Sequence, residues 1–358
     1  MDLVWKILWI TVAAYLAHHT IKAMNIVGFF VPHRHNHQPG PCRLIPGIEH
    51  GSEDIQLVSN GLALISAGWQ TIEAKASEDL RGFYLFDFNQ DEPDKNATKL
   101  TMTGGLDIKD LSPHGISLWT DSNTGRVTMF VVNHGSTSYG NESIEVFEFH
   151  EKTRSVNHLK TIRDAQFKRI NDIVATSSAT FYGTNDCTYS QSNLRWRVEA
   201  FLQTHFGNVV YYDGEKARVV ASGYVLPNGI NISPDGRTMY VLLSGENQMV
   251  VFDRHEDNSL TEVKRVDLYM SRPDNVDVQP DGSLWVAGSW KLLPDEHGRL
   301  SSMVLRAEVG PDHKFTLSEV YVNDGSVIGI SSVAVYHKDQ LLIGTPYSKL
   351  LYCEVKTF

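Results

Sequence analysis

The chain has 358 residues, and its 42% hydrophobic and 10% aromatic content is ample for a large core. The formal net charge of −10 argues against nucleic acid as a partner, because nucleic-acid binding requires a basic patch. Length alone allows two domains, but the repeats described below run almost to the C-terminus and predict one large domain over residues 42–358.

Residues 1–31 are predicted to form a hydrophobic signal or anchor segment. One apolar run extends from Leu3 to Leu16, and a second follows from Ile21 to Val31. The first run has the length of a signal-peptide core and is short for a membrane span. A cleaved signal and a retained anchor both fit; we favour the retained anchor because no small-x-small cleavage site follows. Either one brings the rest of the chain into the secretory pathway, where a retained segment would contact a membrane or lipoprotein surface.

Four further stretches do not follow the repeat pattern. Residues 32–41 hold alternating histidines, which can bind metals, but a flexible, exposed linker is the commoner case and is our prediction. Residues 70–80 are polar and predict a surface loop. Residues 191–203 place apolar side chains at helical spacing, which predicts an accessory helix that covers the site, contacts a membrane or simply packs. The irregular stretch at 289–297 carries Trp290 and would suit a substrate entrance or an interfacial contact.

A strand–turn–strand unit recurs along the chain. Its best copy runs from Asn228 to Val241, where alternating apolar residues lead into a Ser-Pro-Asp-Gly turn and a second apolar run. A second strong copy occupies residues 273–286, and weaker copies begin near residues 51, 113, 170 and 330. Six near-regular, strand-rich repeats predict an all-β fold, a six-bladed β-propeller with four-stranded blades.

One polar residue stands at the head of each repeat, and these residues are Glu53, His114, Asn171, Asn228, Asn275 and Ser331. In a propeller the innermost strand of each blade lines the central channel, so equivalent positions arrive at the same end of one axis. Asp54, Asp172 and Asp274 lie beside these positions. Carboxylate and amide oxygens around one centre form a cage that suits Ca²⁺ rather than Zn²⁺.

The cysteines are Cys42, Cys187 and Cys353. Because the chain ends meet in a ring, a Cys42–Cys353 disulfide would close the propeller in an oxidising compartment; the alternative is three reduced cysteines. Three N-glycosylation patterns occur, at Asn96, Asn141 and Asn231. We expect Asn231 not to be modified, because it lies within a predicted strand.

Seven motifs resemble, in the same order, those of the serum paraoxonase/arylesterase family. They are Gly-Ile-Glu-His-Gly-Ser-Glu-Asp (47–54), Pro-His-Gly-Ile-Ser (113–117), Val-Val-Asn-His (131–134), Asn-Asp-Ile-Val-Ala (171–175), Phe-Tyr-Gly-Thr-Asn-Asp (181–186), Asn-Gly-Ile-Asn-Ile-Ser-Pro-Asp-Gly (228–236) and Leu-Leu-Ile-Gly-Thr (341–345). The resemblance covers about residue 42 to the C-terminus. It implies a calcium-dependent propeller that hydrolyses lactones and aryl esters, with organophosphate hydrolysis as a side activity.

Carried over position by position, the resemblance implies two calcium ions. The catalytic ion would be held by Glu53, Asn171, Asn228, Asp274 and Asn275. A structural ion deeper in the channel would be held by Asp54, Asp172 and the backbone carbonyl of Ile116. His114 and His134 match the family's histidine pair, and Cys42 and Cys353 its disulfide. Predicted substrate-wall positions are Leu226, Ser331 and Trp290.

The departures from the family pattern fall on the cavity wall. Leu226 stands where an aromatic residue is familiar, and Cys187 where a histidine is common. The stretch at 284–290 lacks the family's frequent cysteine–histidine pair. These differences leave the substrate preference open and the chemistry intact.

The sequence therefore predicts a calcium-dependent hydrolase of small-molecule lactones and aryl esters. Ca²⁺ would polarise the carbonyl and stabilise the oxyanion, and His114 with His134 would activate water. The alternative is a non-enzymatic, membrane-tethered chaperone or accessory subunit of a membrane protein, which the apolar N-terminal segment favours. The intact histidine pair favours the enzyme.

Overall fold

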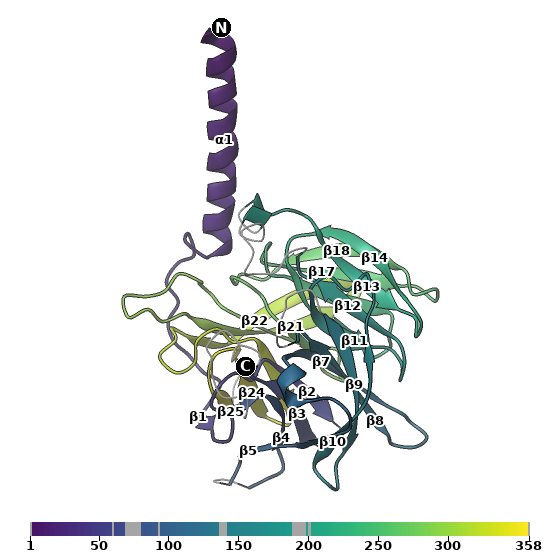
Figure 1. Cartoon of the computed structure of the whole chain (residues 1–358). Coiled ribbons are helices and arrows are strands. Elements are labelled where there is room, and N and C mark those ends of the chain that lie inside the picture. The colour runs from purple at the N-terminus through teal and green to yellow at the C-terminus, as the bar shows by residue number, and fades with distance from the viewer. Residues whose placement is uncertain are drawn as a thin grey trace.

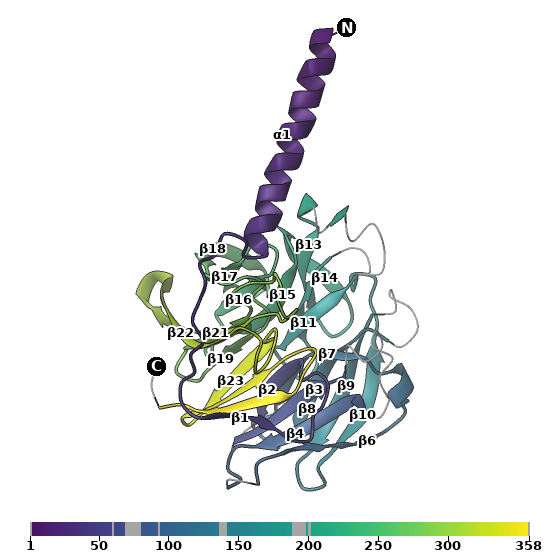
Figure 2. The ribbon, with the colours of Figure 1, turned by 90° about the vertical axis from the view of Figure 1, so that its left-hand side faces the viewer.

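The computed structural model describes residues 2–58, 61–68, 80–91, 94–135, 142–187, 198–199 and 202–356. Its strands form six separate sheets around one central axis, and a long helix projects away from them (Figures 1 and 2). Every sheet contains a run of four antiparallel neighbours. The prediction of an all-β, six-bladed propeller is confirmed.

The blades follow one another in chain order, each beginning with its inner strand. Blade one contains β2 (Asp54–Val58), β3 (Leu62–Ala67), β4 (Gly82–Asp87) and β5 (Ala97–Lys99). Blade two contains β7 (Pro113–Thr120), β8 (Val127–Asn133), β9 (Ser143–His150) and β10 (Ser155–Ile162), with β6 (Thr101–Thr103) added in parallel to β10. Blade three contains β11 (Ile170–Ala175), β12 (Phe181–Asn185), β13 (Gly207–Tyr212) and β14 (Ala217–Tyr224).

The second half of the ring repeats this arrangement. Blade four contains β15 (Pro227–Ile232), β16 (Thr238–Leu243), β17 (Gln248–Arg254) and β18 (Leu260–Asp267). Blade five contains β19 (Val276–Val278), β20 (Leu284–Gly288), β21 (Ser302–Gly310) and β22 (Lys314–Asn323). Blade six contains β23 (Val333–His337), β24 (Gln340–Gly344), β25 (Leu350–Glu354) and β1 (Cys42–Ile45). Short 3₁₀ turns occur at Ile108–Asp110 and Pro311–His313.

The blades are held together by hydrophobic contacts between their faces. Six clusters of buried side chains lie one between each pair of neighbouring blades. Between blades one and two, for example, Leu64 and Leu85 pack with Met129 and Phe147. Middle strands such as β3 and β8 are buried along their whole length, which explains why they read as continuous apolar runs rather than alternating ones.

Hydrogen bonds between different blades fix the repeat heads relative to one another. The hydroxyl of Ser332 donates to the carbonyl of Glu53 (2.7 Å), and that of Thr184 donates to the carbonyl of Asn228 (2.6 Å). The N–H of Asn275 donates to the carbonyl of Ser332 (2.9 Å). The head backbones therefore belong to a rigid inner ring, which is the kind of scaffold that a precise site requires.

The two ends of the propeller close the ring within blade six. Strand β1 pairs antiparallel with β25, in a register that places Cys42 opposite Cys353. These two cysteines form a disulfide, as predicted, and Cys187 is buried and takes part in no disulfide. Figure 2 shows the N-terminal strand β1 lying beside the C-terminal blade.

Replacing both Cys42 and Cys353 with serine is expected to lower the free energy of unfolding by about 2–4 kcal/mol. The disulfide joins residues separated by 311 positions, so its loss frees a very long loop in the unfolded chain. Urea unfolding followed by circular dichroism measures the change. A difference below about 0.5 kcal/mol would show that strand pairing alone closes the ring.

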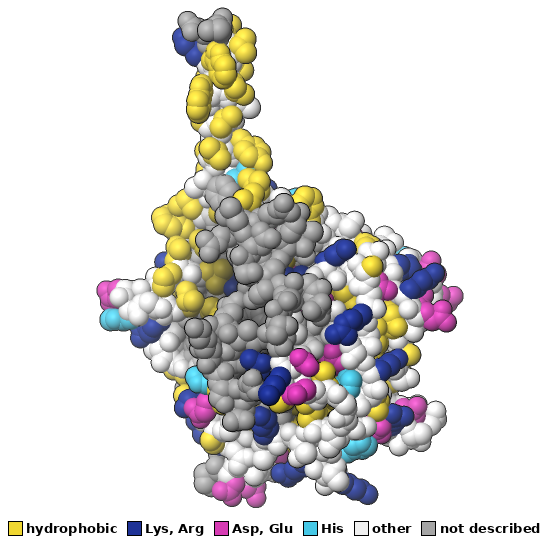
Figure 3. All heavy atoms as spheres, in the orientation of Figure 1, with side chains coloured by type: hydrophobic (Ala, Val, Ile, Leu, Met, Phe, Trp, Pro, Cys, Tyr) yellow, Lys and Arg dark blue, Asp and Glu magenta, His cyan; other side chains and the backbone are white. Residues whose placement is uncertain are grey.

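The N-terminal helix α1 (Asp2–Ile26) projects from the propeller (Figure 1). Most of its apolar side chains are exposed, and Figure 3 shows them along the visible side of the helix. Among the described residues, no helix combines the length and the apolar character that crossing a membrane requires.

The stretch at 32–41 is tied to blade five rather than free. His37 exchanges two backbone hydrogen bonds with Val322, both of 2.9 Å, and Arg34 forms an ion pair with Glu319. The prediction of a flexible linker is therefore wrong for this stretch, although its histidines are exposed as expected. The predicted loop at 70–80 and helix at 191–203 fall largely outside the described residues.

Candidate functional site

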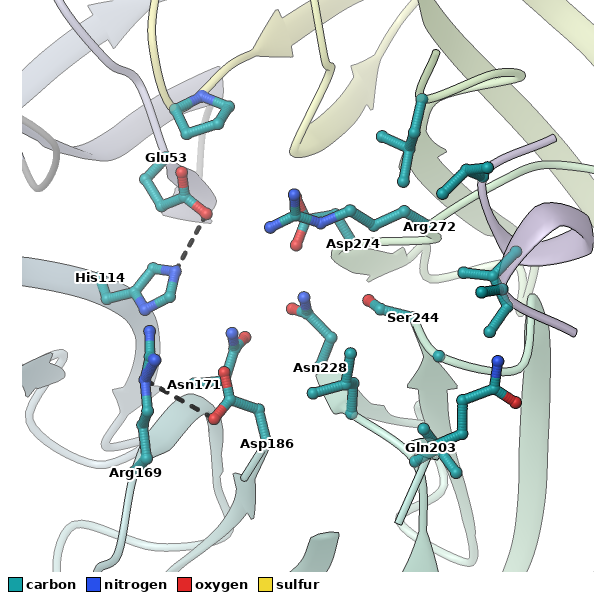
Figure 4. A pocket seen from close by; sticks show the side chains of 18 of the residues that line it. Glu53, His114, Arg169, Asn171, Asp186, Gln203, Asn228, Ser244, Arg272 and Asp274 are labelled. Atoms are coloured by element: carbon teal, nitrogen blue, oxygen red, sulfur yellow. Dashed lines mark hydrogen bonds and ion pairs between the residues drawn. The ribbon is translucent and has the colours of Figure 1, made fainter. Parts of the chain in front are cut away.

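A cavity of about 440 Å³ opens where the inner strands begin (Figure 4). Its polar lining includes Glu53, His114, Arg169, Asn171, Asp186, Asn228, Arg272 and Asp274. Its apolar lining includes Ala23, Ile26 and Val27 near the end of α1, together with Val225, Leu226 and Leu292. The N-terminal helix thus contributes directly to one wall of the cavity.

Four repeat heads converge on this cavity from four blades, and Asp274 joins them from a fifth. Glu53 immediately precedes β2, while His114, Asn171 and Asn228 are the second residues of β7, β11 and β15. Asp274 lies two residues before β19. All five side chains are buried, and Figure 4 shows them around a common space. Their shared place at the start of an inner strand explains why the sequence spacing could locate them.

Two other heads lie differently from these five. Asn275 is buried next to Glu53, with its Nδ2 3.5 Å from the carbonyl oxygen of Glu53. In blade six the residue immediately before the inner strand is Ser332, not the predicted Ser331. Ser331 instead accepts from the N–H of Met303 and donates toward the carbonyls of Gly288 and Met303. These contacts hold its hydroxyl within the fold.

Of the predicted substrate-wall residues, only Leu226 lines the cavity. Ser331 is fully buried by the hydrogen bonds just described. Trp290 is packed in the apolar cluster between blades four and five, with an edge contact to His33. Both side chains are thus held by packing, and neither Ser331 nor Trp290 is among the described residues of the cavity lining.

Among the described residues, no hydrogen-bond donor reaches three buried oxygen atoms of the predicted ligands of the catalytic ion. They are Glu53 Oε2, Asn228 Oδ1 and Asn275 Oδ1. An unsatisfied buried acceptor costs about 1–3 kcal/mol, so three together indicate that a further group binds here. Because all three are carboxylate or amide oxygens, they fit Ca²⁺. No group of three or more His, Cys, Asp or Glu side chains suited to a metal occurs in the described part of the chain. Three of the five candidate ligands are instead asparagines.

The electrostatics of the site also favour a cation. Burial raises the pKa of Glu53 to about 7, against the opposing charge of Arg272. Burial, with the nearby Glu53, raises the pKa of Asp274 to about 7. Two carboxylates that resist ionisation so close together would be stabilised as anions by a divalent cation.

A second pair of buried carboxylates, Asp54 and Asp172, directly follows Glu53 and Asn171 in the chain. Asp54 accepts from the N–H groups of Ile55 (2.8 Å) and Ile116 (2.7 Å). Asp172 accepts from the N–H groups of Ile173 (2.7 Å) and Ile230 (2.9 Å). Burial raises the pKa of Asp54 to about 8, and burial with the charge of Asp54 raises the pKa of Asp172. The two carboxylates therefore share one buried region.

Sequence reasoning missed a third acid near this region. Asp277 is buried, its charge raises the pKa of Asp54, and burial raises its own pKa to about 7. Asp277 lies inside β19, where an alternating polar residue gives no sign of a site.

The two predicted histidines form the centre of a hydrogen-bonded chain. His114 Nε2 lies 3.1 Å from Glu53 Oε1, and His114 Nδ1 lies 2.8 Å from His134 Nε2. His134 Nδ1 lies 2.6 Å from Glu142 Oε2. All four side chains are buried. Burial, with the neighbouring His134, lowers the pKa of His114 well below its usual value, so its ring is neutral at pH 7.

A family model described as arylesterase matches residues 35–355. The chain belongs to the arylesterase family. This arylesterase is 38% identical over 321 residues to human serum paraoxonase/arylesterase 2, covering 88% of each chain. It is 37% identical over 323 residues to human serum paraoxonase/arylesterase 1, again covering 88% of each. Serum paraoxonase/lactonase 3 of Mus musculus is 36% identical over 326 residues, covering 89% of this chain and 90% of its own.

Solved structures support the architecture. A luciferin-regenerating enzyme aligns with a TM-score of 0.53 and 12% identity, over 87% of this chain and 94% of its own. A putative gluconolactonase aligns with a TM-score of 0.53 and 10% identity, over 88% and 92%. At such low identity these two show the fold alone. The family match confirms the resemblance drawn from the seven motifs and makes the chain an esterase.

Sequence reasoning missed Arg169 and Arg272, which line the cavity of this arylesterase, and Glu142, which is hydrogen-bonded to His134. Glu142 precedes β9, Arg169 precedes β11, and Arg272 precedes Asp274 by two residues. Arg169 lies 3.7 Å from Asp186, measured from Nε to Oδ1. None of the three occupies a repeat-head position, so no periodic signal identifies them.

Two glycines allow the inner strands of this arylesterase to approach each other. A Cβ at Gly115 would lie 2.4 Å from Asp172 Oδ1, and one at Gly229 would lie 2.5 Å from the carbonyl oxygen of Asp274. At Gly229 the next obstacle is the Cα of Asn275, at 2.6 Å. Non-bonded atoms do not approach this closely in proteins. Any side chain at Gly229 would therefore displace Asp274 and Asn275, which are two of the candidate ligands.

Gly229→Ala is accordingly expected to lower kcat/KM for an ester substrate by at least about tenfold, since a shift of about 1 Å at a site can cost far more. The matched control is Gly105→Ala, because a Cβ there meets nothing within 4 Å. Steady-state kinetics with phenyl acetate compare the two variants. Equal activity in both would mean that the inner ring tolerates the displacement.

Proposed function

We propose that this arylesterase is a calcium-dependent hydrolase of lactones and aryl esters, with organophosphate hydrolysis as a side activity. One observation carries the proposal. At a single cavity, three buried oxygens that no donor of the described residues reaches lie beside a histidine pair that two carboxylates flank. The first feature suits an oxygen-seeking cation, and the second suits proton transfer at neutral pH.

The proposed catalytic ion would be held by Glu53, Asn171, Asn228, Asp274 and Asn275. The two carboxylates would balance its charge, and the three amide carbonyls would add ligands without adding charge. When bound, Ca²⁺ would polarise the substrate carbonyl and stabilise the developing oxyanion. Asp54, Asp172 and the carbonyl of Ile116 would hold a second, structural ion.

The proposed proton transfers follow from one assignment of the histidine tautomers. If His134 donates from Nδ1 to Glu142, its Nε2 is free to accept from Nδ1 of His114. Nε2 of His114 then carries a lone pair and makes no hydrogen bond to an ionised Glu53, so the attacking water would enter between the two groups and donate to Nε2. That atom would take the proton from the attacking water, while His134 and Glu142 hold the ring and stabilise its positive charge.

We also propose that the propeller lies on the extracellular or lumenal side of a membrane. The Cys42–Cys353 disulfide suits an oxidising compartment. The exposed apolar residues of α1 would contact a membrane or lipoprotein surface. Asn96 is exposed and available for glycosylation, while Asn141 lies outside the described residues. Asn231 uses its amide between blades, since its Nδ2 donates to the carbonyl of Val276 (2.9 Å).

The exposed α1 also favours a second candidate function, that of a membrane-tethered chaperone or accessory subunit. The exposed apolar part of this helix would bind another membrane protein as readily as lipid. The two functions differ in whether the folded, calcium-loaded protein turns over a substrate.

Hydrolysis of a δ-lactone and of phenyl acetate by the purified full chain tests the proposal. With calcium present, turnover of both substrates is expected, and Glu53→Gln should lower kcat/KM by at least about tenfold through the loss of one charged ligand. Glu256→Gln is the matched control, because Glu256 is exposed. A folded, calcium-loaded protein that hydrolyses neither substrate would contradict the proposal and favour the accessory function.

A further inference from the structure

We infer that this cavity selects esters or lactones that carry a carboxylate, and that Arg272 binds that carboxylate. The inference rests on the proposed hydrolase function and adds a substrate class to it. Its starting point is a guanidinium group in the cavity wall that the proposed catalytic steps do not use.

The side chain of Arg272 reaches into the cavity. Figure 4 shows its guanidinium extending past Asp274 toward the space between Glu53 and Asn228. Among the described residues, no side chain forms a hydrogen bond or ion pair with that guanidinium, although its charge partly offsets the raised pKa values of Glu53 and Asp274. The other cationic side chain of the lining, Arg169, differs because it pairs with Asp186.

The backbone holds Arg272 in this orientation. Its φ of 51° lies in the left-handed region, which is uncommon for a bulky residue and strains the backbone. The N–H of Arg272 donates to Asn247 Oδ1 (3.0 Å), and its carbonyl oxygen lies against Gly288, where a Cβ would come within 2.7 Å. A strained backbone fixed on both sides is typical of a residue with a functional side chain.

The charges of the lining leave Arg272 unbalanced when calcium is present. Glu53, Asp186 and Asp274 are the described carboxylates of the lining, and Arg169 and Arg272 are its cations. Arg169 balances Asp186, and a bound Ca²⁺ would balance Glu53 and Asp274. The half-buried Arg272 then carries one positive charge that no group of the cavity neutralises. A substrate carboxylate would supply the missing negative charge, and its two oxygens fit the two parallel donors of a guanidinium.

The rest of the lining indicates where the remainder of such a substrate lies. Ile26, Val225 and Leu226 form an apolar wall in the same cavity. An aliphatic ring or chain packs on this wall, while the ester carbonyl faces His114 and the carboxylate faces Arg272. The preferred substrate is thus a lactone or ester whose acyl part is aliphatic and whose end is anionic.

The test compares a δ-lactone that bears a ring carboxylate with the matched primary amide. For the unsubstituted chain, kcat/KM should favour the carboxylate by about tenfold or more, and Arg272→Gln should remove that preference, chiefly by raising KM. For the amide, kcat/KM should change by less than about threefold between the unsubstituted chain and Arg272→Gln. Arg272→Lys should retain part of the preference, and Arg237→Gln, at an exposed position, should retain all of it.

Other outcomes separate this inference from the proposed function. Equal turnover of the carboxylate and the amide would overturn the carboxylate preference and leave the hydrolase intact. If neither lactone nor phenyl acetate is hydrolysed, the proposed function fails, and calorimetric binding of the ring-opened carboxylate still decides the role of Arg272. If Arg272→Gln does not weaken this binding, the proposed role of Arg272 is overturned. A variant that loses calcium instead of substrate preference would show that Arg272 only stabilises the neighbouring carboxylates.

Discussion

Chelation of calcium is expected to lower the unfolding temperature of the chain sharply and to abolish its ester turnover. The metal-free protein buries Glu53, Asp54, Asp172 and Asp274, and burial raises the pKa of each. Ionising these groups at pH 7 opposes folding unless a cation compensates. If free calcium exceeds its dissociation constant a thousandfold, binding stabilises the folded chain by about 4 kcal/mol. Thermal unfolding followed by circular dichroism, with calcium and with excess chelator, measures this difference.

Magnesium provides the control for this experiment. Mg²⁺ demands near-ideal octahedral geometry at short distances and retains its water, so it should not restore stability in a cage of buried carboxylates and amides. Identical unfolding curves with calcium, with magnesium and with chelator would contradict a calcium site in the channel.

Replacing His114 with Gln is the second change for which we expect a large effect. A positioned general base contributes about 10²- to 10⁴-fold, so kcat for a δ-lactone should fall by at least about a hundredfold. Glutamine can keep a hydrogen bond toward Glu53 or His134 but cannot take a proton from water. Steady-state kinetics, together with calcium content and unfolding temperature, would show that the loss is chemical rather than structural.

His150→Gln is the matched control, because His150 lies at the end of β9 and is exposed. An unchanged kcat in His114→Gln, with calcium still bound, would exclude His114 as the base. The hydrolase would then need another proton acceptor, and the candidates on the described lining are Glu53, Asp186 and Asp274.

The fold and half of the site were predictable because the ring repeats one geometry. Any residue that opens an inner strand is carried to the same end of the axis, so the spacing of Glu53, His114, Asn171 and Asn228 was sufficient to bring them together. The Ser331–Ser332 pair shows the limit of that argument. Two identical residues stand next to each other, and the pattern cannot say which one opens the strand.

The rest of the site depends on contacts that no repeat encodes. Glu142, Arg169 and Arg272 lie on connections between strands, where each blade differs from the others. The contribution of α1 to the cavity was equally hidden, because its apolar residues cover the whole helix and mark no face for docking. Trp290 differs from its prediction for another reason. Its position in an irregular stretch predicted exposure, but its side chain is buried by packing between blades four and five.

The most direct test of the central claim is the rate of δ-lactone hydrolysis measured against free Ca²⁺ in chelator-buffered solution. The unsubstituted chain and Asp274→Asn are compared, since the substitution keeps the size of the side chain and removes one ligand charge. We predict that turnover rises from zero to saturation with calcium, and that Asp274→Asn requires at least about tenfold more calcium to reach half of its maximum. Turnover that is independent of calcium, or a midpoint that the substitution leaves unchanged, would contradict the account.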